Sequence, residues 1–282
     1  TQPRVLATYA RLYLLPIPSQ YNLLHDVQPS RSVFDPPTTF LAILGLIGYA
    51  GVAVAMAVRN RLLSFCLLWP LINLVVESSV LPLELIYEHR MYLPMFGLAL
   101  ATAYIAGRLL LRQPVASWAV VMGTVVVALS VSTFIRNTVW RDTLTLWTDV
   151  IQKSPRLPRP LVNRGGAYAN QSEWLLAIND YERATDIYPM FDMAWVGRGI
   201  ARLNTGNPER AIEDFTKAGQ RAITSDVLTS CYRQRAIAYS QIGNITQAIE
   251  DYKRAIAYDP QDVVSRFNLA NAYRKQSLHE EA

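Results

Sequence analysis

The sequence predicts an all-α protein in which a multi-span transmembrane helical domain is followed by a solenoid of paired helices. Two observations lead to this fold class. The first half contains apolar stretches near the length of about 20 residues that a bilayer core requires. The second half repeats its prolines, aromatic residues and small residues at a fixed spacing, which is typical of stacked helical hairpins.

The composition indicates that part of the chain lies outside water. Of its 282 residues, 51% are hydrophobic and 17% are charged, whereas soluble domains carry about a quarter charged residues. Residues 1–139 hold nine of the 27 basic residues and five of the 22 acidic ones. We attribute the net charge of +5 to membrane topology. No nucleic acid partner is expected, because no run of Lys and Arg is interleaved with aromatic residues.

Four membrane spans are predicted within residues 38–136. They cover residues 39–58, 62–77, 92–111 and 118–135. The second is short and contains Pro70, which membrane helices tolerate. Residues 1–37 are expected to form an extracytoplasmic loop with one short apolar helix, because five prolines from Pro16 to Pro37 exclude a long helix after about Leu15.

Two short basic turns orient these spans. They contain Arg59 to Arg61 and Arg108 to Arg112, and the positive-inside rule places such turns in the cytoplasm. The predicted location is therefore an integral, multi-pass membrane protein. Its repeats would lie on the extracytoplasmic side, in a bacterial periplasm or in the lumen of the endoplasmic reticulum.

The repeat half begins with a half-repeat connector at residues 137–157 and continues as a solenoid over residues 158–282. Pro155 and Pro189 are 34 residues apart, which is the period of tetratricopeptide repeats. Units are expected to begin at residues 158, 192, 229 and 263. In each unit a small residue such as Gly165 lets the second helix approach the first.

The inner helices of such an array line a concave groove that fits a protein or extended peptide partner. The groove residues predicted here are Arg159, Asn163, Asn170, Asn204, Arg233, Gln234, Gln241, Asn268, Asn271 and Arg274. The alternative interpretation, left open at this point, is that these side chains are simply solvated helix faces.

A polar segment between the second and third predicted spans carries the side chains best suited to ligand binding or catalysis. It contains Glu77, Glu84, Glu88, His89, Arg90 and Tyr92. Charged residues at a bilayer surface are costly unless they are paired or functional. One hypothesis is an ion-pair network that holds the loop. The other is that the Arg90 guanidinium and His89 bind a lipid phosphate.

This segment and its neighbours resemble a known family. Three features carry the resemblance: the run E-S-S-x-x-P-x-E-x-x-x-E-H-R-x-Y-L-P from Glu77, the run N-x-x-x-W-R-D-x-x-x-L-W-x-D from Asn137 and the repeats that follow. Together they are similar to the transmembrane and tetratricopeptide repeat (TMTC) O-mannosyltransferases and to bacterial C-type glycosyltransferases with C-terminal repeats. The chain resembles the C-terminal half of such proteins.

The resemblance implies an enzyme that transfers sugar from a polyprenyl-phosphate donor to proteins outside the cytoplasm. It assigns Glu84, Glu88, His89, Arg90 and Tyr92 to the late outer loop, and the first catalytic outer loop of the family has no counterpart here. The catalytic residues are therefore unknown. No cofactor is evident, because the two cysteines are distant and neither C-x-x-C nor a His pair occurs. A divalent metal stays open for the full-length enzyme.

Two functions from different classes follow. The first is a membrane glycosyltransferase whose repeats dock the protein acceptor. The second is a non-catalytic, membrane-anchored scaffold or accessory subunit that binds and assembles partner proteins of a membrane complex.

Overall fold

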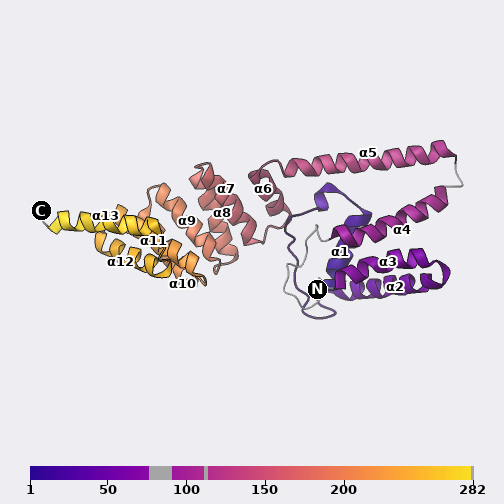
Figure 1. Cartoon of the computed structure of the whole chain (residues 1–282), viewed down its shortest axis with the longest axis horizontal. Coiled ribbons are helices and arrows are strands. Elements are labelled where there is room, and N and C mark those ends of the chain that lie inside the picture. Colours follow the sequence, from indigo (N-terminus) through magenta and orange to yellow (C-terminus); the bar gives the residue numbers. More distant parts are fainter. Residues whose placement is uncertain (76–90, 111–113, 281–282) are drawn as a thin grey trace. The chain divides into compact units, whose positions relative to one another are not determined.

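The computed structural model describes residues 1–75, 91–110 and 114–280, and every regular element in them is a helix (Figure 1). These residues divide into two compact units, Thr1–Arg141 and Asp142–Ala282. The all-α prediction and the helical solenoid are confirmed for this part of the chain.

The first unit is built from apolar helices. They are α1 (Gln2–Leu14), the 3-10 helix η1 (Pro18–Gln20), α2 (Thr38–Arg59), α3 (Arg61–Val75), α4 (Tyr92–Leu110) and α5 (Val115–Val139). α3 packs between α2 and α4, and α1 lies against α2. Val5 and Tyr9 of α1 form a buried cluster with Leu74 and Met91.

Only two described helices are long and apolar enough to cross a membrane, α2 with 22 residues and α5 with 25. The prediction of four spans is therefore not supported beyond these two. α3 has 15 residues and contains Pro70. Its Cys66 is 1% exposed and its Leu74 6%, so these two residues pack between helices. An apolar run in a sequence does not distinguish that use from contact with lipid.

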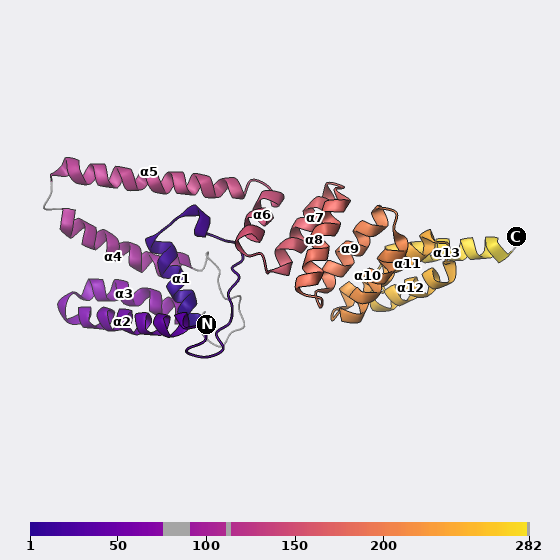
Figure 2. The same ribbon diagram turned by 180° about the vertical axis from the view of Figure 1, so that it is seen from behind.

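The second unit is a series of eight helices within the described residues (Figure 2). They are α6 (Thr143–Lys153), α7 (Pro158–Asn170), α8 (Trp174–Ile187), α9 (Asp192–Asn204), α10 (Pro208–Arg221), α11 (Ser225–Gln241), α12 (Ile245–Tyr258) and α13 (Val263–Glu280). Each helix packs on the next, and α9 also contacts both α7 and α11. The first helices of successive pairs therefore lie side by side, as in a solenoid.

The turns within the helix pairs share one backbone conformation. Ser172, Gly206 and Gly243 follow α7, α9 and α11, and their φ angles are 62°, 74° and 81°. Glycine adopts positive φ without the steric cost that a Cβ brings. The two glycines therefore allow α9 and α11 to reverse directly into α10 and α12, and Ser172 occupies the same position with a side chain.

Small residues face aromatic rings inside each pair, as the sequence predicted. A Cβ built on Gly165 would lie 3.0 Å from Cε1 of Tyr181, and one built on Gly199 would lie 2.6 Å from Cε1 of Phe215. In the third pair, Ala236 and Tyr252 share one buried cluster. The absence of a side chain is thus what permits the close approach of α9 and α10.

Replacing Gly199 with alanine is expected to destabilise the α9–α10 pair by about 1–3 kcal/mol, because the new methyl group collides with a ring that is 1% exposed. Hydrogen exchange of α9 and α10 amides measures this change. Gly166→Ala is the control, since its Cβ would meet only the Tyr181 hydroxyl at 3.8 Å. Equal amide protection in the two variants would show that the Phe215 ring does not exclude a methyl group at position 199.

Candidate functional site

A concave site in the second unit lies on α6, α7, α8 and α9. It is a groove of about 1060 Å³, which we call the α6–α9 groove. Its lining residues are Asp142, Thr143, Leu144, Trp147, Val162, Asn163, Gly166, Ala167, Asn170, Gln171, Tyr181, Met193, Val196, Gly197 and Ile200. Apolar side chains make up much of the walls, and polar groups come from asparagine and glutamine side chains together with Asp142, Thr143 and Tyr181.

Two glycines and one tyrosine shape this groove. A Cβ on Gly197 would lie 2.5 Å from Cε1 of Tyr181, so the ring occupies the space that a side chain of α9 would take. Gly166 adds no side chain on the facing helix. Burial raises the pKa of Tyr181 to about 12. Its hydroxyl therefore stays neutral near pH 7 and can donate a hydrogen bond.

The structure brings two of the predicted groove residues into this site, Asn163 and Asn170 of α7. Arg159 is exposed at the start of the same helix. The other seven lie outside the α6–α9 groove, at the end of α9 (Asn204), on α11 (Arg233, Gln234, Gln241) and on α13 (Asn268, Asn271, Arg274). Their assignment to a peptide surface stays a prediction.

Two of those residues have local partners that account for their position. The Asn204 Nδ2 donates to the Ile200 carbonyl oxygen over 2.9 Å. The Arg233 guanidinium pairs with Asp262 over 3.0 Å and thereby joins α11 to the start of α13. The ion pair of Arg233 with Asp262 therefore has a structural role.

A repeated arginine–aspartate pair, which the sequence analysis missed, joins the two helices of every complete repeat. The three bidentate pairs are Arg164–Asp180, Arg198–Asp214 and Arg235–Asp251. Partners in each pair are 16 residues apart in sequence. The signal was present, since this spacing recurs once per repeat.

Each arginine also reaches back to the second helix of the preceding pair. Arg164 donates to the Thr148 hydroxyl of α6 over 3.3 Å, and Arg235 donates to Thr216 of α10 over 2.9 Å. Thr148 thus plays the part in α6 that Thr216 plays in α10. α6 therefore makes the same kind of contact with the next first helix as α10 does.

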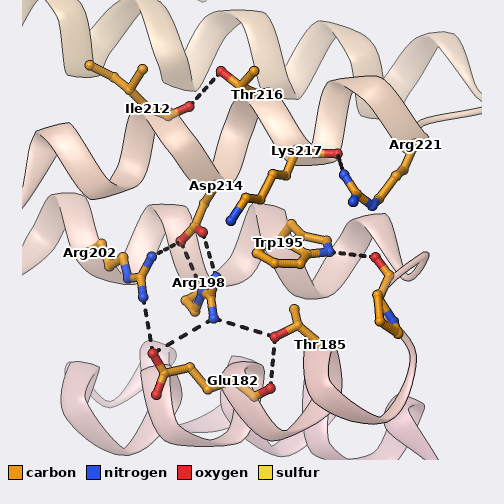
Figure 3. Close-up of polar contacts among 11 residues, drawn as sticks. Glu182, Thr185, Trp195, Arg198, Arg202, Ile212, Asp214, Thr216, Lys217 and Arg221 are labelled. Carbon is orange, nitrogen blue, oxygen red and sulfur yellow. Dashed lines mark hydrogen bonds and ion pairs between the residues drawn. The ribbon is translucent and has the colours of Figure 1, made fainter.

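The middle pair has the densest network (Figure 3). Asp214 is fully buried and binds both Arg198 and Arg202, with closest distances of 2.7 and 2.8 Å. Arg202 also binds Glu182 of α8 over 3.1 Å. One carboxylate therefore holds two guanidinium groups, and the cluster connects α8, α9 and α10.

The hydrogen bonds to the aspartates raise the arginine pKa values. The bond to Asp180 raises the pKa of Arg164, and the bond to Asp251 raises that of Arg235. Both arginines stay cationic at any physiological pH. These pairs therefore act as permanent links between helices and offer no proton for chemistry.

Asp262 caps the start of α13. Its carboxylate accepts from the Ser265 backbone N–H over 3.3 Å and from the Ser265 hydroxyl over 2.5 Å. Burial alone would raise the pKa of Asp262, but these bonds and Arg233 hold it below its usual value. The ionised form of Asp262 is therefore favoured more strongly in the folded chain than in the unfolded one.

Replacing Asp262 with alanine is expected to destabilise α13 by about 1 kcal/mol near pH 7, which is the usual cost of a lost N-cap. Because the folded pKa is lowered, this contribution is complete above the unfolded pKa near 4 and is lost as pH falls through the folded value. Hydrogen exchange of α13 between pH 3 and 7 tests this. A difference between wild type and variant that grows toward acid would contradict it.

The predicted phosphate-binding loop cannot be placed by this structure. Glu77, Glu84, Glu88, His89 and Arg90 lie outside the described residues. Tyr92 is the first residue of α4, and its side chain is 84% exposed. Within residues 1–75, 91–110 and 114–280, no group of three His, Cys, Asp or Glu side chains is arranged to hold a metal ion.

Comparison with known families identifies the repeats. Residues 162–225 match the family described as tetratricopeptide repeat, and residues 237–277 match the family described as TPR repeat. The chain carries tetratricopeptide repeats. The prediction of tetratricopeptide repeats is therefore confirmed over these residues. Such repeats indicate a scaffold for protein–protein interaction.

The chain is also similar to a human relative, "Tetratricopeptide repeat protein 6", with 29% identity over 103 residues. The match covers 36% of this chain and 19% of that protein.

Two solved structures with tetratricopeptide repeats are similar to parts of the chain. The first TPR domain of human RPAP3 is 21% identical, has a TM-score of 0.43, and the match covers 46% of this chain and 99% of that one. The crystal structure of MamA is 20% identical, has a TM-score of 0.45, and the match covers 49% and 79%.

Proposed function

We propose that this protein is a membrane-anchored scaffold whose tetratricopeptide repeats hold a protein partner in the α6–α9 groove. The observation that carries the proposal is the groove itself. Its volume is about 1060 Å³, and its walls include Leu144, Trp147 and Ile200. Contact of a guest with such side chains removes apolar surface from water, which is the main source of binding free energy.

The polar groups of the groove favour an extended segment. Asn163 and Asn170 are two turns apart on α7 and face the same space. Each amide offers both a donor and an acceptor, so each can pair with the backbone of a guest strand. The apolar walls would then receive the guest side chains.

The proposed membrane location is supported by α2 and α5. The most apolar 18-residue window of α5 has none of its residues buried, and that of α2 has 6% buried. Two long apolar helices exposed in this way favour a nonpolar environment. Their basic turns favour a cytoplasmic position for residues 59–61, with the repeats on the extracytoplasmic side.

A site-specific crosslinking experiment tests the groove. A photoreactive amino acid at position 163 or 170 of the full chain is expected to crosslink one partner in cells. The matched control is position 179, an exposed asparagine of α8 outside the groove. Once the partner segment is known, Asn163→Ala with Asn170→Ala is expected to weaken its binding about tenfold or more, at about 1 kcal/mol per lost hydrogen bond. Equal crosslinking from position 179 would defeat the proposal.

Transfer of sugar from a polyprenyl-phosphate donor is the second candidate function. It is supported by the sequence run from Glu77 to Pro94 and by the run from Asn137 to Asp149. In this proposal His89 and Arg90 hold the donor phosphate and the repeats dock the acceptor protein. Its test is donor binding and transfer by the full-length protein with His89→Ala or Arg90→Ala. Unchanged donor binding in both variants would remove this candidate and leave the scaffold standing.

A further inference from the structure

Three arginines gather where α2 turns into α3 and where α4 approaches its end. Arg59 and Arg61 flank Asn60, whose Nδ2 donates to the Tyr104 hydroxyl of α4 over 2.6 Å. The Arg108 guanidinium carbon lies 5.1 Å from the centre of the Tyr104 ring. The Asn60–Tyr104 contact therefore fixes the α2–α3 turn beside the guanidinium of Arg108. We call Arg59, Arg61 and Arg108 the arginine rim.

The charge of this rim is not neutralised within the described residues. All three side chains are exposed, and none forms an ion pair with a described carboxylate. This contrasts with Arg164, Arg198 and Arg235 of the second unit, each of which is held by an aspartate. Three neighbouring cations without a counter-charge attract an anion.

Apolar side chains border the same rim. Val58 is 93% exposed, Leu109 is 67% exposed and Leu62 is 52% exposed. Each stands next to one of the arginines in sequence. Exposed apolar side chains beside these cations are poorly suited to bulk water. The combination suits the boundary of a bilayer, where apolar groups meet lipid chains and arginines meet headgroups.

We propose that the arginine rim binds the phosphate headgroups of anionic phospholipids. A guanidinium presents a planar fork of donors that matches phosphate oxygens. The stack of Arg108 on Tyr104 orients one such fork, and the fixed turn sets the spacing of the other two. The proposal rests on the membrane location of α2 proposed above and is independent of the α6–α9 groove.

The test uses the full chain in neutral detergent, titrated with phosphatidylglycerol or phosphatidylcholine, with bound lipid counted by native mass spectrometry. The wild type is expected to prefer phosphatidylglycerol. Each arginine near a membrane surface contributes about a fivefold preference, so Arg59→Gln, Arg61→Gln and Arg108→Gln together should lower it on the order of a hundredfold. The charge-matched control is Arg210→Gln, Arg274→Gln and Lys275→Gln, three exposed bases of the second unit.

The outcomes separate this site from its alternatives. Equal binding of both lipids by the wild type, or an unchanged preference in the rim variant, overturns the proposal. A loss of preference in the control variant as large as in the rim variant also overturns it, because bulk charge would then be the cause. Displacement of the lipid by millimolar inorganic phosphate would assign the rim to a free anion and likewise reject a lipid site.

Failure of the membrane location is recognised separately. Flotation of the wild type with neutral phosphatidylcholine vesicles reports that α2 and α5 enter a bilayer, whatever the headgroup. Flotation without a preference for phosphatidylglycerol retains the membrane anchor and removes the lipid site. Absence of flotation with any vesicle removes both, and the crosslinking test of the groove is unaffected.

Discussion

Replacing Asp214 with asparagine is expected to destabilise the α9–α10 pair by about 3–5 kcal/mol, the usual cost when one member of a buried charge cluster is removed. Asp214 is fully buried, and its carboxylate oxygens bind Arg198 and Arg202. The amide keeps the shape but leaves the partly exposed Glu182 as the one described carboxylate that still contacts the two guanidinium groups. Hydrogen exchange of α8 to α11 amides in the full chain measures the loss.

Two further variants make this prediction sharp. Glu213→Gln changes the neighbouring, exposed carboxylate and should alter the free energy of opening by less than about 0.5 kcal/mol. A triple variant with Asp214→Leu, Arg198→Met and Arg202→Leu should recover most of the loss, since apolar replacement of a whole buried cluster is often neutral. Protection in Asp214→Asn within 1 kcal/mol of wild type would mean that the cluster contributes little.

Replacing Phe215 with alanine is expected to cost about 3–5 kcal/mol through lost burial and the cavity that remains. The Phe215 ring is 1% exposed and packs with Leu203, Ala211 and Ala238 in one cluster. These residues come from α9, α10 and α11, so the variant should loosen two successive repeats. Because repeat arrays are stabilised by contacts between neighbours, the effect should spread into α11.

Phe267 of α13 is the matched control for this second prediction. It is the same residue type in the same unit, but its side chain is 67% exposed. Phe267→Ala should therefore change stability by less than about 0.5 kcal/mol. Similar losses of amide protection in the two variants, or a loss at Phe215 confined to α10, would contradict the packing argument.

The groove illustrates what the sequence could not resolve. Periodicity places Asn163, Gln234 and Asn268 on the first helices of three different pairs, and it treats all of them as groove residues. In the structure Asn163 lines the α6–α9 groove and the other two do not. The difference arises because the groove is lined by residues between Asp142 and Ile200, and neither Gln234 nor Asn268 lies on those helices. Free space between helices depends on side chains from several elements at once.

The sequence alone determined the helical character of this protein, its repeat period and its apolar segments, because each of these is a local pattern of residue types along one helix. The tertiary structure decided which apolar residues are covered by neighbouring helices, as Cys66 and Leu74 of α3 are, and where a groove opens. It also revealed the arginine–aspartate pairs and the arginine rim. Those features join side chains from different helices, and only the packing of helices brings such side chains within bonding distance.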